Sequence, residues 1–255
     1  MRIRANNPSP MTLTGTNTYV IASADDTTAA LIDPGPELTQ HREKFLAELG
    51  DRKLSAIILT HQHADHSEML GSVEHWAPEV PVYAVLEKFG RLTPPVADGD
   101  TIAFGTATTD VMEVIATPGH TMDSISLIHD HVLYSGDTVL GEGTTIVTHP
   151  EGSLRDYLNS LDLLLRLLDE GAYSTIEPAH GPSIESPAQV LEYYRSHRLE
   201  RIEQVRGALA QGATRATDVC DIVYHDVDPR VRGAAEQIVR AQLAYLGVLA
   251  PDDQS

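Results

Sequence analysis

The chain has 255 residues, of which 42% are hydrophobic and 22% charged, enough apolar sequence for one large domain or for one domain with an appendage. Asp and Glu (37) outnumber Lys and Arg (18), so the formal net charge is −19, which argues against a protein that holds nucleic acid or an anionic membrane on a basic patch. The single cysteine, Cys220, excludes an intramolecular disulfide and a thiolate metal cluster, and we expect it to be a buried apolar residue.

Short β-type runs separated by loops dominate the chain from Met11 to about Gly181. In chain order the expected strands are Thr18–Ile21, Ala29–Ile32, Leu54–Leu59, Val80–Val85, Val111–Ala116, Ile125–His129 and Val132–Ser135. Helical periodicity lies between them at Glu37–Leu49, Ser67–Ala77 and Leu154–Leu168. The mixture predicts an α/β domain over residues 1–185.

The pattern becomes helical after Pro187. Three helices are expected, at Ala188–Ala210, at Ala216–Tyr224 and, after Asp228–Pro229, at Val231–Leu246. They predict a small C-terminal module over residues 186–255. The first residues lack the apolar core of a signal peptide and no later stretch approaches a membrane span, so we expect a cytoplasmic protein with no membrane partner.

The most informative segment, THQHADH at residues 60–66, directly follows the expected strand Leu54–Leu59. Side chains two apart on an extended strand end point the same way, so His61 and His63 can converge on one ion. Asp65 and His66, at the start of the next helix, then point to a second position nearby. Imidazole and carboxylate ligands suit zinc, iron or manganese.

Three later motifs supply further candidate ligands. His120 ends TPGH (117–120), Asp137 ends SGD (135–137) and His180 lies in PAHG (178–181), each after an apolar strand and close to a glycine that permits a sharp turn. Taken singly, each is as well explained by a polar loop or a turn residue. Together with the first segment they favour a metal site with seven ligands.

With these motifs in this order, the sequence resembles the metallo-β-lactamase superfamily of hydrolases from about Met11 to Gly181. The resemblance implies an αββα sandwich with metals at one edge of its two sheets. It implies a first metal on His61, His63 and His120, a second metal on Asp65, His66 and His180, and Asp137 as the bridge between them. Asp33, in ALIDPGP (30–36), matches the motif that supports the metal-binding loops from behind, so its expected role is structural.

The segments NPSPMTLTGTNTY (7–19) and LGEGTT (140–145) extend the resemblance to the β-lactamase-like-protein-2 branch. That branch contains single-strand endoribonucleases and is similar to fungal thioesterases that act on carrier-bound acyl chains. It also has a winged-helix-like C-terminal module, which the three expected helices would match.

The ligand set implies a hydrolase in which two divalent ions share and ionise a water, giving a bridging hydroxide. Zinc is the expected metal, with manganese or iron as alternatives, and the expected substrate is a thioester, lactone or related acyl compound, either small or carrier-bound. Asp65 and Asp137 are the candidate catalytic residues, Asp65 as a ligand that could also accept a proton. The candidate substrate contacts are Asn17, Tyr19, Glu142, Thr144 and His149.

Three other functions stay open. A single-strand endoribonuclease is disfavoured by the few bases and by an aromatic content of only 5%. A persulfide dioxygenase would hold one iron on the residues matching His61, His120 and Asp137, whereas a non-enzymatic scaffold would be expected to have lost ligands, and none is lost. A bridging Asp137 also separates the chain from true β-lactamases.

The first C-terminal helix carries four polar or aromatic side chains at related spacing, for which packing or a solvated face is favoured over a position in the cleft: Tyr193, His197, Arg198 and Arg201. The oligomeric state is left open.

Overall fold

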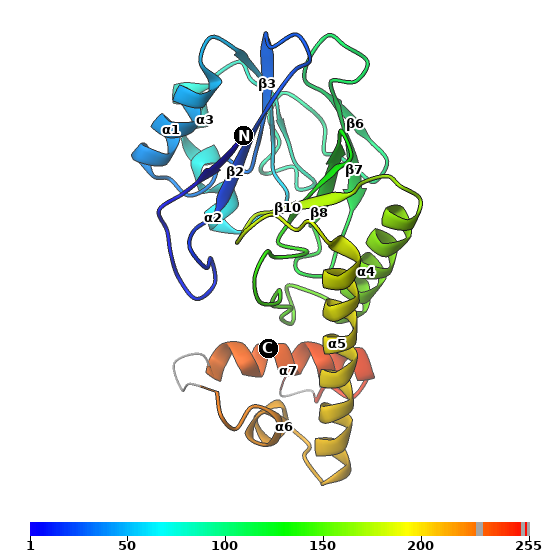
Figure 1. Ribbon diagram of the computed structural model, residues 1–255. Helices are drawn as coiled ribbons and strands as arrows, with labels where there is room; N and C mark the ends of the chain where they lie inside the picture. Colours follow the sequence, from blue (N-terminus) through cyan, green and yellow to red (C-terminus); the bar gives the residue numbers. More distant parts are fainter. Residues whose placement is uncertain (228–231, 251–252, 254–255) are drawn as a thin grey trace.

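The computed structural model, which describes residues 1–227, 232–250 and 253, contains two five-stranded sheets with helices on their outer faces (Figure 1). The first sheet has the order β1 (Arg2–Arg4), β2 (Asn17–Ala22), β3 (Thr28–Ile32), β4 (Lys53–Ile58), β5 (Val82–Tyr83). The second has the order β10 (Thr175–Pro178), β9 (Val132–Gly136), β8 (Ile125–His129), β7 (Val111–Ala116), β6 (Thr101–Ala103).

Alternation along the strands explains why the two sheets pack face to face. Tyr19 and Ile21 of β2 point inward, into a core that includes Met112 and Leu127 of the second sheet. Val20, between them, points the other way, into the core beneath the helices. Each sheet is therefore apolar on both faces and must be covered on both.

Helices cover the two outer faces. The first sheet packs against α1 (Thr39–Leu49), the 3-10 helix η1 (Glu68–Ser72) and α3 (Val73–Trp76). The short helix α2 (Ala64–Ser67) directly precedes η1. The second packs against α4 (Leu154–Asp169), whose leucine stripe is buried on that sheet. The predicted αββα sandwich is confirmed.

Some expected elements were wrong in extent. The helix expected over Ser67–Ala77 is broken into α2, η1 and α3, with the weak helix former Gly71 in the 3-10 segment. The strand expected over Val80–Val85 is only the two residues of β5, which begins directly after Pro81, a residue with no N–H to donate, and ends at Tyr83. The short edge strands β1 and β6 were not predicted, since three residues carry too little pattern.

The C-terminal part consists of α5 (Pro187–Ala210), α6 (Ala216–Val223) and α7 (Arg232–Leu246). Its helical character is confirmed, and Cys220 is buried among these helices as expected. Residues 187–227 and 232–250 contain no strand, so no wing accompanies the helices there. Val231 and Asp228–Pro229 lie outside the described residues.

The domain boundary expected between residues 185 and 186 remains a prediction. Helix α5, which follows it, shares one hydrophobic core with α4 on the other side and with α7. None of the described helices is both long enough and apolar enough to cross a membrane.

Candidate metal centre

Seven side chains form two neighbouring groups at one edge of the sandwich. A loop at that edge contacts α5, and Figure 1 shows the C-terminal helices below the two sheets. The segment after β4 and helix α2 contribute four of them, and the segments after β7, β9 and β10 contribute one each. They are the seven predicted from the sequence: His61, His63, Asp65, His66, His120, Asp137 and His180.

The first group comprises His61, His63, His120 and Asp137. Nδ1 of His63 lies 2.9 Å from Nε2 of His61 and 3.0 Å from Nε2 of His120. Oδ2 of Asp137 lies 3.6 Å from Nε2 of His120. His61 and His120 thus offer Nε2 to a common point, whereas His63 offers Nδ1.

The second group comprises Asp65, His66 and His180. Oδ2 of Asp65 lies 3.4 Å from Nε2 of His66 and 3.3 Å from Nε2 of His180. Oδ1 of Asp137 lies 3.6 Å and 3.2 Å from the same two nitrogens. Asp137 therefore turns one oxygen to each group, as a carboxylate shared by two cations would.

The separations between carboxylate and imidazole atoms fit divalent cations. Nitrogen and oxygen ligands lie about 2.0–2.2 Å from zinc, which places tetrahedral donor atoms roughly 3.3–3.6 Å apart. The separations between carboxylate oxygens and imidazole nitrogens run from 3.2 to 3.6 Å, close to this range, whereas the two separations between imidazole nitrogens of the first group, 2.9 and 3.0 Å, are shorter. A donor set of imidazoles and carboxylates suits zinc, manganese or iron.

The unsatisfied polar atoms and the local charge also fit divalent cations. Asp137 Oδ1 and His66 Nε2 are buried and make no hydrogen bond to a described residue, a state that costs about 1–3 kcal/mol per group. Although burial opposes it, the neighbouring carboxylates raise the pKa of His66 well above its usual value and that of His180 to about 9. The carboxylates thus favour positive charge here, which a cation would supply in place of protons. Burial and the neighbouring His66 lower the pKa of His61 well below its usual value, as suits a neutral ligand.

Asp33 holds the second group from behind, as expected. Its Oδ2 lies 2.8 Å from Nδ1 of His66, and its two oxygens accept hydrogen bonds from the backbone N–H and the hydroxyl of Thr60, each at 2.8 Å. The Thr60 hydroxyl in turn lies 3.1 Å from Nδ1 of His61. Because a carboxylate accepts the Nδ1 proton of His66, Nε2 is left free to bind a metal.

The remaining histidines are held by groups that carried no sequence signal. Nδ1 of His120 donates to the carbonyl of Ile146 (2.7 Å), and Nδ1 of His180 lies 3.4 Å from the carbonyl of Gly15. Carbonyl oxygens are present at every residue, so no motif could reveal these two.

Two supporting side chains were also missed. Glu151 Oε1 lies 3.3 Å from Nε2 of His63, and the Thr16 hydroxyl donates to Oδ2 of Asp65 at 2.8 Å. Thr16 lies in the N-terminal segment on which part of the family resemblance rests, which was its only signal. Glu151 lies in a loop with no motif.

One of the predicted substrate contacts, Tyr19, is corrected by the structure, and a second, Asn17, has a structural role as well. Tyr19 is in the core between the sheets, where its hydroxyl donates to the carbonyl of Pro178 (2.7 Å). The Asn17 amide is buried and donates to the carbonyls of Pro178 and Gly181. Tyr19 therefore supports the segment that carries His180 instead of facing a cleft. Asn17 supports the same segment but also lines a surface groove with Glu142, so its contact with a substrate remains a prediction.

The other three candidate contacts lie on the loop after Asp137. Glu142 is exposed and lines a surface groove with Arg2 and Arg4. Thr144 is half-buried, and His149 lies against α7, where its backbone N–H donates to the carbonyl of Gln237. Their contact with a substrate remains a prediction.

The polar stripe on α5 behaves as the favoured interpretation expected. Arg198 is buried, donates to the carbonyl of Thr145 and lies over the ring of Tyr157. Tyr193 is exposed and stacks on His197. Packing therefore accounts for Arg198, and a solvated face for Tyr193.

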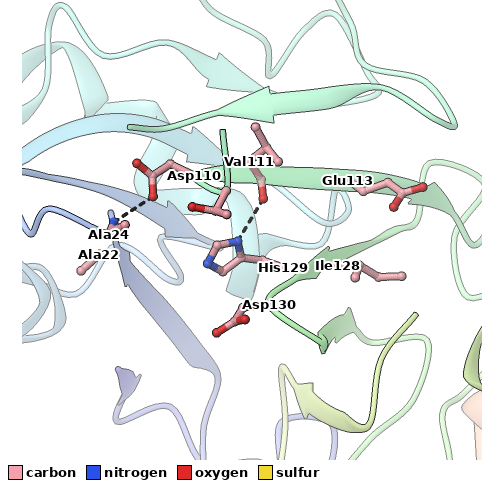
Figure 2. Close-up of a pocket in the computed structure, with 9 residues that line it drawn as sticks. Ala22, Ala24, Asp110, Val111, Glu113, Ile128, His129 and Asp130 are labelled. Carbon is pink, nitrogen blue, oxygen red and sulfur yellow. Dashed lines mark hydrogen bonds between the residues drawn. The ribbon is translucent and has the colours of Figure 1, made fainter. Parts of the chain in front are cut away.

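A second hollow lies away from these ligands, beside Ala22 at the end of β2 and His129 at the end of β8 (Figure 2). Asp110 there accepts a hydrogen bond from the Ala24 backbone N–H (2.8 Å), and His129 Nδ1 donates to the carbonyl of Val111 (3.0 Å). Both polar groups are used within the fold, and none of the seven candidate ligands lines this hollow.

Known proteins are similar to this chain in sequence and in fold. The metallo-beta-lactamase superfamily matches residues 11–173. A beta-lactamase-like protein 2 homolog of Caenorhabditis elegans is 33% identical over 264 residues, covering 96% of this chain and 83% of that protein. An atrochrysone carboxyl ACP thioesterase of Aspergillus chevalieri is 31% identical over 245 residues, covering 94% of this chain and 75% of that protein.

A metallo-beta-lactamase family protein of Thermus thermophilus matches in structure with a TM-score of 0.78 at 22% identity, over 97% of this chain and 92% of that one. As its motifs predicted, the chain belongs to the metallo-beta-lactamase superfamily.

Proposed function

We propose that this chain is a dinuclear metal-dependent hydrolase of thioesters or related activated acyl compounds. The observation that carries the proposal is the placement of Asp137, whose two oxygens face the two groups of candidate ligands. Two divalent cations, with zinc as the first candidate, would when bound supply an ionised water as nucleophile and polarise the substrate carbonyl.

Asp65 is the residue best placed to assist the nucleophile. Its side chain is 25% exposed, whereas that of Asp137 is 11% exposed. Its contacts with Thr16, His66 and His180 all involve Oδ2. Oδ1 is therefore the oxygen that can orient a water or accept its proton.

The substrate class is supported by charge and by one relative. With a net charge of −19, the protein is poorly suited to track the backbone of a long RNA, which depends on many Lys and Arg contacts. A relative with 31% identity is named as a thioesterase that acts on an acyl carrier protein. A small or carrier-bound thioester is therefore the leading substrate, and a lactone is the next.

The test combines metal analysis with a substrate panel. We expect about two zinc ions per chain and metal-dependent cleavage of a thioester within a panel that also contains a lactone, a cephalosporin and a single-stranded oligonucleotide. Asp137→Ala and His63→Ala should abolish this activity. Thioester cleavage that survives both substitutions would refute the proposal.

Two outcomes would assign another function. Ligand-dependent cleavage of the oligonucleotide alone would identify an endoribonuclease. One iron per chain with oxygen consumption would identify a persulfide dioxygenase, but a single iron on the first group would leave Asp65 and His180 without a cation to bind.

A further inference from the structure

The loop over residues 138–153, here called the supporting loop, connects β9 to α4 and contacts two of the three histidines of the first group. The carbonyl of Ile146 accepts the Nδ1 proton of His120 at 2.7 Å. Oε1 of Glu151 lies 3.3 Å from Nε2 of His63. One stretch of chain thus contacts the outer nitrogens of both rings.

His63 differs from the other candidate histidines in its orientation and exposure, so a hydrogen-bond partner for its second ring nitrogen, Nε2, is important. It is the histidine that turns Nδ1 toward the common point, so its proton must reside on Nε2 for Nδ1 to bind a metal. Its side chain is also 32% exposed, whereas those of His66 and His180 are at most 1% exposed. Packing alone therefore fixes this ring less firmly than the others.

Glu151 is itself oriented by neighbouring side chains. Nε2 of Gln62 donates to Oε1 of Glu151 at 3.2 Å, and Nζ of Lys88 donates to Oε1 of Gln62 at 3.3 Å. These contacts direct a carboxylate toward the edge of His63 where the proton must reside. Surface carboxylates gain little from isolated pairs, but a carboxylate next to a ligand's outer nitrogen selects its tautomer and orientation.

The supporting loop also makes hydrogen bonds to the C-terminal helix α5. Arg198 of α5 donates to the carbonyl of Thr145, and the backbone N–H of Leu140 donates to the hydroxyl of Tyr194 at 2.9 Å. These contacts relate the position of the loop to the C-terminal module.

We infer that Glu151 is a positioning residue for the first metal, acting through the ring orientation and tautomer of His63, an inference that rests on the proposed function. Such partners typically change metal affinity by about 10–100-fold. Glu151 contacts no candidate ligand of the second group in the structure, so its effect should be confined to the first.

The test is a titration of the metal-free protein with cobalt(II) alone, followed by its visible absorption and by a competing chelator. We expect Glu151→Ala to weaken one of two binding steps by about 10–100-fold, and Glu151→Gln, which keeps an acceptor oxygen, to restore part of the loss. His63→Ala identifies which step belongs to the first group. Glu79→Gln, at an exposed glutamate before β5, is the matched control and should bind as the wild type does.

Each other result has a definite meaning. Two steps within twofold of wild type in Glu151→Ala would overturn the inference alone. Equal weakening of both steps, or a lower free energy of unfolding of the metal-free variant, would show a general structural role and overturn it too. A wild-type chain that takes up no cobalt would overturn the proposed function and the inference together.

Discussion

Replacing Asp33 by Asn tests whether the charge behind His66 sets the chemistry of the second group. Asp33 is buried, and its Oδ2 lies 2.8 Å from Nδ1 of His66. The asparagine oxygen can still accept from the Thr60 backbone N–H, but its NH₂ would then face His66 Nδ1. His66 would have to accept at Nδ1 and carry its proton on Nε2, the atom that faces Asp65 and Asp137.

The magnitude follows from the lost charged hydrogen bond. Such a bond contributes about 1.5–3 kcal/mol. Since about 1.4 kcal/mol corresponds to a tenfold change in an equilibrium constant, the second metal should bind roughly 10–100-fold more weakly. Asn also suits the backbone, because residue 33 has a φ of 50°, a region that Asn tolerates better than most residues.

The measurement is zinc affinity by chelator competition, together with the unfolding of the metal-free protein. Asp51→Asn, at an exposed position, is the control for the loss of one negative charge. The reasoning fails if Asp33→Asn binds two zinc ions with wild-type affinity, because the tautomer of His66 would then not depend on the carboxylate.

Three further predictions concern stability. Gly119→Ala should lower the free energy of unfolding by about 2–5 kcal/mol, since φ is 139° and the new Cβ would lie 2.3 Å from the Tyr157 Cα. At Gly143, where φ is 73°, the new Cβ would have no atom within 4 Å, so Gly143→Ala should lower the free energy of unfolding by only about 1–2 kcal/mol. Equal losses for the two variants in denaturant titrations would contradict the predicted clash at Gly119. Burial lowers the pKa of folded His41 to about 4, below its unfolded value, so stability should fall by about 2–3 kcal/mol as the pH drops from 6.5 to 4, and His41→Gln should flatten that slope. Zinc at 1,000 times its Kd should raise the melting temperature by roughly 8–16 °C per ion, and an equal rise in Asp137→Ala would count against the shared carboxylate.

The sequence allowed the candidate ligands to be predicted because most of them follow the end of a strand, and Asp65 and His66 lie on the short helix α2 just beyond β4. His61 and His63 follow β4, Asp137 follows β9 and His180 follows β10. Strand ends at one edge of a sandwich are held by hydrogen-bonded ladders, so residue type and position after a strand suffice to bring these side chains together. Asp33 also directly follows a strand, β3, but its supporting role was predicted from the family resemblance of ALIDPGP.

The direction in which a strand side chain points was harder to predict than the position of a residue along the strand. Tyr19 was expected to line a cleft, but β2 is covered on both faces and the Tyr19 side chain lies in the core between the sheets. In a one-sided sheet, alternation separates inner from outer residues. In a sheet buried on both faces, alternation only tells which of the two cores a side chain enters. The residue pattern therefore did not indicate that the Tyr19 side chain is buried and cannot contact a substrate.

Long-range support of the centre was outside the reach of sequence patterns. Glu151 and His63 are 88 positions apart, and their contact depends on the path of a loop that has no periodicity. The carbonyls of Ile146 and Gly15 have no residue-specific signal at all. Such contacts emerge only when sheets, loops and C-terminal helices are placed together.

The two groups of candidate ligands nevertheless follow one physical rule. Each contains a histidine whose outer nitrogen lies next to a carboxylate, Asp33 for His66 and Glu151 for His63. Asp33 is buried behind its group, whereas the side chain of Glu151 is 43% exposed on a loop that contacts the C-terminal helices. The second group is therefore built into the sandwich itself, while the first depends on an exposed side chain of a loop, a position that can vary more freely than a buried one. Differences in metal affinity among chains with this ligand set should accordingly arise mainly in the first group.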